Sequence, residues 1–217
     1  MRPPFVYDPP TTPVSELFET EEVLFVDKPS GLLSVPGRLA EHKDSLLTRL
    51  EALYPSVRLI HRLDMDTSGV MVFAKTDVAQ RWINRQFENR LVTKTYLAEV
   101  TGQIAETGTV NLPLIADWPN RPLQKVDAEG KPSVTHWRVL ERREHSCIVA
   151  LTPETGRSHQ LRVHMAEQGH AILGDRFYAN ESVATQSDRL RLHAYELQLC
   201  VVEHAPSIKV SAPCPFY

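Results

Sequence analysis

Short apolar tracts separated by turn residues recur along the chain, and this pattern predicts β-strands. A late strand is expected within Arg189–Val202, where leucines alternate with polar residues. The other predicted strands are Glu22–Val26, Leu32–Val35, Val70–Phe73, Tyr96–Val100, Thr109–Leu112, Thr135–Leu140 and Cys147–Leu151.

Helical spacing of apolar residues occurs in three segments. Ser45–Leu53 predicts a helix capped by Asp44 or Ser45, a second helix follows Asp77 as its cap, and Ser158–Gln168 predicts a third. Many short strands, few helices and no regular βαβ alternation predict an α+β fold. We expect a mainly antiparallel mixed β-sheet core flanked by helices and loops.

The start of the chain is rich in proline, with five prolines in the first 14 residues. Proline favours extended backbone, so residues 1–20 are expected to form an extended arm. A length of 217 residues fits one domain or a tight pair. We assign residues 21–217 to a single domain, because no internal repeat divides them.

Composition excludes several classes of protein. The chain is 42% hydrophobic and 24% charged, which is typical of globular proteins, and its three cysteines form no CxxC pair. No apolar run reaches the roughly 18 residues that span a bilayer, and no apolar segment of signal-peptide length begins the chain. We therefore expect a soluble cytoplasmic protein without a membrane partner. No apolar stripe predicts an interface, so a monomer is expected.

The net charge of −3 argues against a uniformly basic surface, but the charge is unevenly distributed. Residues 61–94 hold six basic and four acidic side chains, and residues 131–176 hold seven and five, so each segment carries +2. The motifs that could carry chemistry lie in these two segments. A basic excess at a site is compatible with an anionic partner.

The first motif runs from His61 to Gly69, with sequence HRLDMDTSG, between two apolar tracts. Asp64 lies between Arg62 and Asp66, so neighbouring charges of both signs can tune its ionisation. An ordinary polar turn with a salt bridge would explain the same pattern.

The second motif is Thr155–His164, which begins at a glycine turn and opens the third predicted helix. His159 and Arg162 share one face of that helix. The histidines at 159, 164 and 170 have poor spacing for metal ligands, and HExxH is absent, so we predict no metal site. A buried or capping histidine is the simpler interpretation.

Two further aromatic positions are candidates for contact with a nucleobase. Tyr96 follows Lys94 at the start of a strand, although a core tyrosine is the usual case. Asp117–Pro122 is a proline-stiffened loop in which Trp118 suits base stacking and Arg121 suits a phosphate. A stiff surface loop with a buried tryptophan is the alternative.

Taken in order, these motifs resemble the RluA-type pseudouridine synthases. The matching segments are Lys28–Leu32 (KPSGL), His61–Asp64 (HRLD) with Thr67–Gly69 (TSG), Lys94–Tyr96 (KTY), Gly156–His164 (GRSHQLRVH), and Gly174–Tyr178 (GDRFY). The loop Asp117–Pro122, called the tryptophan loop below, and the segment Gln124–Val126 resemble the RluA subgroup. The resemblance implies the pseudouridine synthase fold, no S4 domain, and no metal or organic cofactor.

The resemblance also implies what the chain does and which residues do it. It implies isomerisation of uridines in 23S rRNA and at position 32 of the tRNA anticodon stem-loop, by base flipping. Asp64 corresponds to the nucleophile, Tyr96 to the tyrosine on the target uracil and a candidate base, and Arg162 to the arginine paired with the aspartate. Arg62 corresponds to the arginine that displaces the base. The expected substrate-binding residues are Arg62, His61, Trp118, Arg121 and Leu161.

Two other hypotheses remain open at this point. A glycosidase could use Asp64 and Glu154 as its pair of carboxylates. A catalytically silent RNA-binding module could retain the same fold. The separation of the Asp64 and Glu154 carboxyl groups tests the glycosidase, and the silent module predicts that Asp64→Asn leaves RNA modification unchanged.

Overall fold

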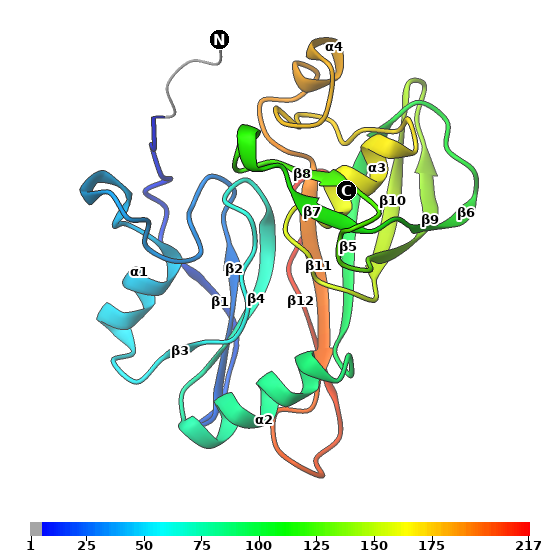
Figure 1. Cartoon of the computed structure of the whole chain (residues 1–217). Helices are drawn as coiled ribbons and strands as arrows, with labels where there is room; N and C mark the ends of the chain where they lie inside the picture. Colours follow the sequence, from blue (N-terminus) through cyan, green and yellow to red (C-terminus); the bar gives the residue numbers. More distant parts are fainter. Residues whose placement is uncertain (1–5) are drawn as a thin grey trace.

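One large, mixed β-sheet organises the molecule. The structure is a computed structural model that describes residues 6–217. Within that range, eight strands form the continuous order β1-β2-β4-β11-β5-β10-β9-β6, while β3 joins β4 and β12 joins β11 (Figure 1). The strands of this sheet are β1 (Ser15–Glu19), β2 (Val23–Lys28), β3 (Arg58–Leu59), β4 (Ser68–Ala74), β5 (Thr93–Thr101), β6 (Thr107–Asn111), β9 (Val134–Arg142), β10 (Ser146–Pro153), β11 (Leu192–Leu199) and β12 (Ile208–Ser211).

Helices flank this sheet, and a small hairpin lies beside it. Figure 1 shows α1 next to the β1–β2–β4 half and α3 next to the β5–β10–β9 half, with α2 at the lower edge and α4 at the upper edge. These elements are α1 (Leu46–Leu53), α2 (Asp77–Glu88), α3 (Gln160–Glu167), α4 (Glu181–Ala184), the 3₁₀ turns η1 (Ala40–His42) and η2 (Trp118–Asn120), and the hairpin strands β7 (Leu114–Ala116) and β8 (Gln124–Val126). The α+β prediction is confirmed.

Two main apolar clusters lie along the sheet, one in each half. One contains β2 and β4 with the apolar faces of α1 and α2, and the other contains β5, β10 and α3. Tyr96 packs against both clusters. The two halves meet where β4 pairs with β11, which is the parallel pair among the described strands. The chain enters β4 from the loop that carries Asp64, so this junction fixes where that loop lies.

The junction requires glycine at position 69. Gly69 has φ +114°, a backbone conformation that side chains with a Cβ rarely adopt. A Cβ built there would lie 2.2 Å from the carbonyl oxygen of Ala194 on β11. The glycine therefore allows the two strands to approach closely just after the candidate loop.

The predicted strand at Leu32–Val35 is wrong. The carbonyl groups of Leu33 and Ser34 accept hydrogen bonds from the first N–H groups of α1, at 2.8 and 3.2 Å. The Ser34 hydroxyl also bonds the backbone N–H and carbonyl of Leu63. Because its polar groups serve a helix N-terminus and a loop, this segment has no sheet ladder.

The predicted arm at residues 1–20 begins outside the described residues, because the structure describes the chain from residue 6. Ser15–Glu19 form β1, which pairs with β2 as an edge strand of the sheet. The preceding residues are also anchored. The Tyr7 hydroxyl donates to the Asp44 carbonyl at 2.9 Å, and Arg49 donates to the Pro10 carbonyl at 2.8 Å. The cap of α2 also differs from the prediction, because the N-cap is Thr76 and not Asp77.

Candidate active site

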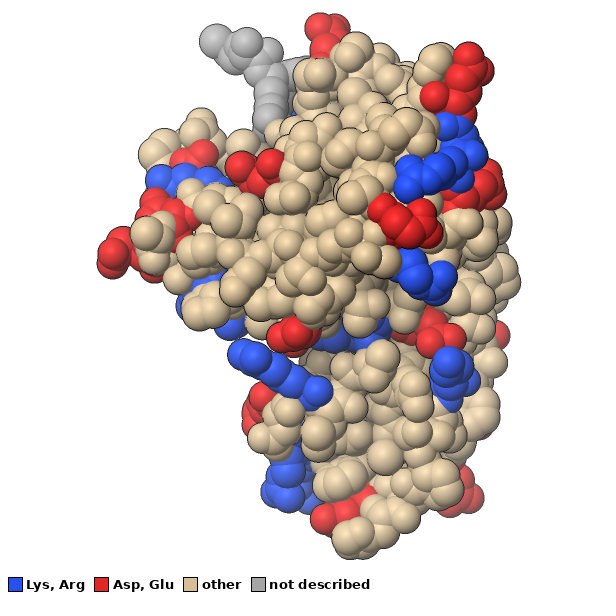
Figure 2. All heavy atoms as spheres, turned by 90° about the vertical axis from the view of Figure 1, so that its right-hand side faces the viewer, with Lys and Arg blue, Asp and Glu red and all other residues tan. Residues whose placement is uncertain are grey.

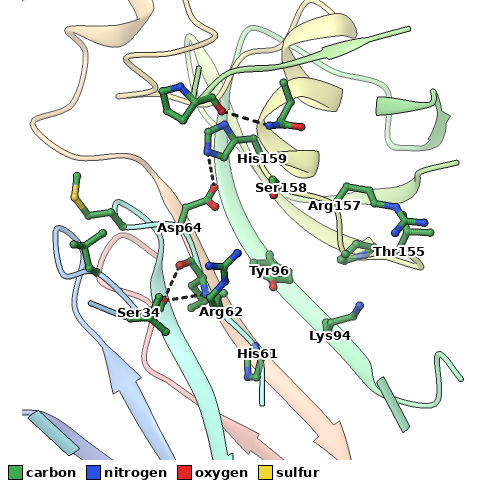
Figure 3. A pocket seen from close by; sticks show the side chains of 18 of the residues that line it. Ser34, His61, Arg62, Asp64, Lys94, Tyr96, Thr155, Arg157, Ser158 and His159 are labelled. Carbon is green, nitrogen blue, oxygen red and sulfur yellow. Dashed lines mark hydrogen bonds and ion pairs between the residues drawn. The ribbon is translucent and has the colours of Figure 1, made fainter. Parts of the chain in front are cut away.

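A cavity of about 810 Å³ lies between the two halves of the molecule. Figure 3 shows side chains from the His61–Met65 loop, β5 and the turn before α3 converging on it. The hairpin β7–β8 closes another side through Ala116 and Gln124. A smaller hollow of about 110 Å³ continues past Asp64 towards Arg162. Both sequence motifs therefore face one cavity.

The buried side chain of Lys28 holds the His61–Met65 loop in place through hydrogen bonds. Its ammonium group donates to the carbonyl oxygens of Pro29, Leu32 and Met65 at 2.9, 2.7 and 2.9 Å. Burial lowers the pKa of Lys28 to about 7, and the carboxylates of Asp66 and Asp64 oppose that shift. The sequence analysis gave this lysine no role beyond its place in a turn motif.

Asp64 points at two nitrogen-bearing side chains. Its Oδ2 lies 3.5 Å from Nη1 of Arg162 and 3.8 Å from Nε2 of His159. The Asp64 side chain remains 29% exposed, so a ligand in the cavity can reach it. The expected pairing of Asp64 with Arg162 is therefore present, but it is not the main contact of this arginine.

The main partner of Arg162 is Asp175. Nε and Nη2 of Arg162 donate to the two oxygens of Asp175 at 2.8 and 2.7 Å, and both side chains are almost fully buried. Burial disfavours the charged guanidinium, but the hydrogen bonds and charge of Asp175 outweigh it and raise the pKa of Arg162. Backbone N–H groups of Phe177 and Tyr178 complete the shell of Asp175. Asp175 lies in a matched motif, yet its sequence spacing gives no sign of this pairing.

His159 belongs to a chain of hydrogen bonds that fixes its protonation. The Tyr178 hydroxyl accepts the backbone N–H of Gln124 at 2.9 Å and lies 2.6 Å from Nδ1 of His159. Burial raises the pKa of Tyr178 to about 12, so the phenol keeps its proton and donates it to Nδ1. Burial also lowers the pKa of His159, although the charge of Asp64 opposes this. The imidazole is therefore neutral, with its Nε2–H directed at Asp64.

Tyr96 forms a wall of the cavity while packing against both apolar clusters. Burial, followed by the nearby charge of Asp64, raises the pKa of Tyr96. Its phenol is consequently neutral near pH 7. A neutral phenol suits a flat apolar wall better than it suits a general base.

His61 and Arg62 are adjacent in sequence but lie in different surroundings. Nε2 of His61 accepts the backbone N–H of Val72 at 3.1 Å, and its ring stacks on Phe87 with centroids 5.1 Å apart. Burial and the charge of Lys94 lower the pKa of His61 to about 4, so this wall of the cavity is uncharged. Arg62 is exposed and lines both the cavity and the smaller hollow.

The tryptophan loop lies at the rim of the cavity. The Trp118 side chain is 65% exposed, which rules out the buried tryptophan considered from sequence. The guanidinium of Arg121 stacks on its ring, 3.3 Å from the centroid, and Arg121 lines the cavity. Leu161 is buried in the core and contributes to the smaller hollow.

The other acidic and histidine candidates lie in different environments. Glu154 contacts His136 at 2.7 Å and lines a separate hollow, so the side chains next to Asp64 are Arg162 and His159 rather than a second carboxylate. His164 bonds Thr135 and the carbonyl of Leu112. Among residues 6–217, no three His, Cys, Asp or Glu side chains gather as metal ligands. In the same range, no helix combines the length and apolar character needed to cross a bilayer.

Comparison with known proteins identifies the family. The model of the family described as RNA pseudouridylate synthase matches residues 22–167, which include the Asp64 loop and the whole of α3. The chain belongs to the RNA pseudouridylate synthase family. It is accordingly an isomerase that acts on RNA, and the resemblance seen in the sequence is confirmed.

Related bacterial proteins share about half of their residues with this family member. One from Vibrio parahaemolyticus serotype O3:K6 is 52% identical, covering 97% of this chain and 88% of the relative. Another from Escherichia coli strain K12 is 50% identical, covering 97% and 98%. Both are named dual-specificity RNA pseudouridine synthase RluA.

Solved structures agree with the family fold. Human RNA pseudouridylate synthase domain containing 1 has a TM-score of 0.79 and 30% identity, covering 100% of this chain and 88% of that one. Human RNA pseudouridylate synthase domain containing 4 has a TM-score of 0.76 and 25% identity, covering 93% and 89%. The pseudouridine synthase fold expected from the motifs is confirmed.

Proposed function

We propose that this enzyme isomerises uridines in two structured RNAs, 23S rRNA and the tRNA anticodon stem-loop at position 32. The dual-specificity name of its relatives supports two kinds of substrate. The resemblance of the tryptophan loop to the RluA subgroup supports these two RNAs. A compact enzyme can recognise both if it reads the shape of a short stem-loop and a few unstacked bases.

The observation that carries the proposal is the position of Asp64, accessible in the cavity and close to Arg162. As the nucleophile, its carboxylate attacks C1′ of the sugar or C6 of the base. The N-glycosidic bond breaks, the uracil turns, C5 bonds to C1′, and the bond to Asp64 is released. C5 loses its proton to solvent and N1 takes one up, so the product is an isomer of the substrate. Arg162 favours the ionised carboxylate while remaining anchored on Asp175.

The walls of the cavity hold the detached base. A base stacked in a loop must be extruded to reach Asp64, at a cost of a few kcal/mol. Tyr96 packs on the flat face of the uracil, with His61 and Leu161 beyond it. Arg62, which is exposed at the mouth, enters the space that the base leaves and stacks there.

The rim contacts the neighbouring nucleotides. Trp118 presents an exposed ring for a base, and Arg121, already stacked on that ring, contacts phosphate. Residues 21–217 act together as one catalytic domain. The enzyme works as a cytoplasmic monomer, and its own side chains supply the chemistry.

Tritium release tests this proposal, because C5 of uracil loses its hydrogen only when C5 joins the sugar. The substrates are an anticodon stem-loop labelled with tritium at C5 of position 32 and a labelled fragment of unmodified 23S rRNA. We expect the wild-type enzyme to release tritium from both. Release from only one would contradict dual specificity. Binding of both without release would support the silent RNA-binding module.

A further inference from the structure

The hollow that Glu154 lines has a volume of about 300 Å³ and lies next to the catalytic cavity. Lys94 and Pro153 line both spaces, and Arg90 lines only the hollow. Figure 3 shows Lys94 on the same strand as Tyr96, further along the cavity wall. Side chains two positions apart on a strand share a face, roughly 6.6 Å apart. The hollow therefore begins beside the place proposed for the target base.

The two cations of this hollow form no ion pair with residues 6–217. Arg90 is exposed and Lys94 is half-buried. Across residues 6–217, neither side chain makes a hydrogen bond or an ion pair. Glu154 is the acidic residue that lines the hollow, but its carboxylate is engaged by His136 at 2.7 Å. Burial and then the charge of Arg90 lower the pKa of Lys94.

Two like charges held together in a partly buried hollow repel each other, so an anion between them would stabilise the arrangement. The backbone at Arg90 places one of these charges. Arg90 follows the C-cap of α2 and lies in the left-handed region with φ 58°, where glycine or asparagine would cost less. Its N–H donates to the carbonyl of Phe87, so this geometry is fixed by the helix end.

We propose that Arg90 and Lys94 bind one backbone phosphate of the substrate RNA next to the target uridine. This inference rests on the proposed function and adds a subsite to it. RNA is the appropriate anion because the hollow shares Lys94 and Pro153 with the cavity that receives the base. The face in Figure 2 intersperses basic with acidic side chains, so no continuous positive field on that face holds the backbone. Individual pairs of cations, such as Arg90 and Lys94, must therefore hold the RNA backbone.

Salt dependence of RNA binding tests the subsite. The variants are Arg90→Gln and Lys94→Gln, and Arg81→Gln is the matched control. Arg81 is an exposed arginine on α2, the helix that precedes Arg90, and lies nine residues before Arg90. Each lost phosphate contact reduces the slope of log K against log salt by about 0.7–0.9. We expect that reduction and weaker binding for the two test variants. Lys94→Arg keeps the charge and should bind like wild type.

Replacing single phosphates of the RNA with an uncharged analogue identifies the phosphate that Arg90 and Lys94 bind. Methylphosphonate replaces one phosphate at a time around the target uridine in the stem-loop. We expect one position to weaken wild-type binding, and the same substitution to have no further effect on the Arg90→Gln/Lys94→Gln double variant. Equal losses in both proteins at every position would overturn the proposal. Test variants that match Arg81→Gln in salt slope would overturn it too.

These results are distinguishable from failure of the proposed function. If wild type releases tritium but the two test variants bind RNA with an unchanged salt slope, the subsite is wrong and the function stands. If wild type binds with the expected cation dependence but releases no tritium from any RNA, the isomerase function fails and the subsite stands. Circular dichroism of each variant separates loss of binding from loss of folding.

Discussion

At the scale of single residues, the site depends on one buried arginine between two carboxylates. Arg162 uses Nε and Nη2 on Asp175 and directs Nη1 towards Asp64. The bidentate pair fixes the plane of the guanidinium, so the third nitrogen has little freedom. Asp64 thus meets a cation whose position is set by a residue outside the cavity.

Replacing Asp175 with asparagine should destabilise the protein strongly. The change leaves Asp64, at 3.5 Å, as the nearest remaining counter-charge of the buried guanidinium of Arg162. Breaking a buried pair from one side costs about 3–5 kcal/mol. Urea denaturation measures this, with the exposed Asp188→Asn as a control for the same chemical change. A loss below about 1 kcal/mol would show that Asp175 is not the anchor.

Replacing Tyr178 with phenylalanine should slow the reaction without unfolding the protein. The ring stays beside Arg162, but the hydroxyl that donates to Nδ1 of His159 is lost. The imidazole can then take the other tautomer and turn its Nε2 lone pair towards Asp64. We expect a single-turnover rate about tenfold lower, the factor that one lost hydrogen bond of about 1.4 kcal/mol represents. An unchanged rate would contradict the hydrogen-bond chain.

At the scale of elements, the catalytic loop is placed by the strand that follows it. The loop ends at β4, which crosses close to β11 through Gly69. Lys28 and Ser34 hold the other side of the loop through backbone contacts with Met65 and Leu63. The loop is therefore held at both sides, because Lys28 and Ser34 bond to its main chain and β4 fixes its end.

Gly69→Ala should prevent normal folding. Its Cβ would overlap the Ala194 carbonyl and would also demand a strained backbone. Gly169→Ala separates backbone strain from steric overlap. Gly169 has φ +79°, but no atom lies within 4 Å of the added Cβ. We expect the control to lose only about 1–2 kcal/mol from backbone strain. Thermal melting of both variants measures the difference, and equal melting temperatures would contradict the close strand approach.

The sequence predicts most elements because apolar tracts and caps are local signals. It identifies the strands at 70–73, 96–100 and 147–151 and the helix capped at Ser45. It fails at Leu32–Val35, where an apolar tract bonds a helix and a loop. It also overlooks Ser15–Glu19, whose partly exposed edge position leaves little apolar pattern.

The candidate site is also predictable only in part, because some of its features are local in sequence and others depend on long-range contacts. Motifs indicate which segments matter, including the resemblance that points to Asp64. They do not reveal that Arg162 is held by Asp175, or that Tyr178 reaches His159 from beyond α3. Those contacts depend on how separate loops fold together, and no spacing in the chain encodes them.

At the scale of the whole molecule, buried neutral histidines tie stability to pH. His193 lies between two partners. Its Nε2–H donates to the Ala212 carbonyl at 3.1 Å, and Nδ1 accepts from the Ser68 hydroxyl at 2.8 Å. Burial is the main reason that the pKa of His193 is lowered to about 4. Charging this ring would break the contact with Ser68, next to the catalytic loop.

Stability should therefore fall as pH drops from about 6.5 to 4. The unfolded histidine takes up a proton near pH 6.5, whereas the folded one resists until about 4, so protons favour unfolding within that window. His193 alone can account for up to about 3 kcal/mol. Urea denaturation at pH 7.5 and 4.5 measures the change. His193→Gln, which cannot charge, should show a smaller pH difference than wild type; an equal difference would contradict the assignment.

The most direct test compares two neighbouring aspartates. Asp64→Asn and Asp66→Asn change the same loop by the same chemistry, but Asp64 lines the cavity and Asp66 does not. Tritium release from C5-labelled stem-loop RNA is measured for both variants, with RNA affinity determined in parallel. We predict that Asp64→Asn binds RNA and releases no tritium, while Asp66→Asn releases it at a rate close to wild type. Substantial release by Asp64→Asn would contradict Asp64 as the nucleophile.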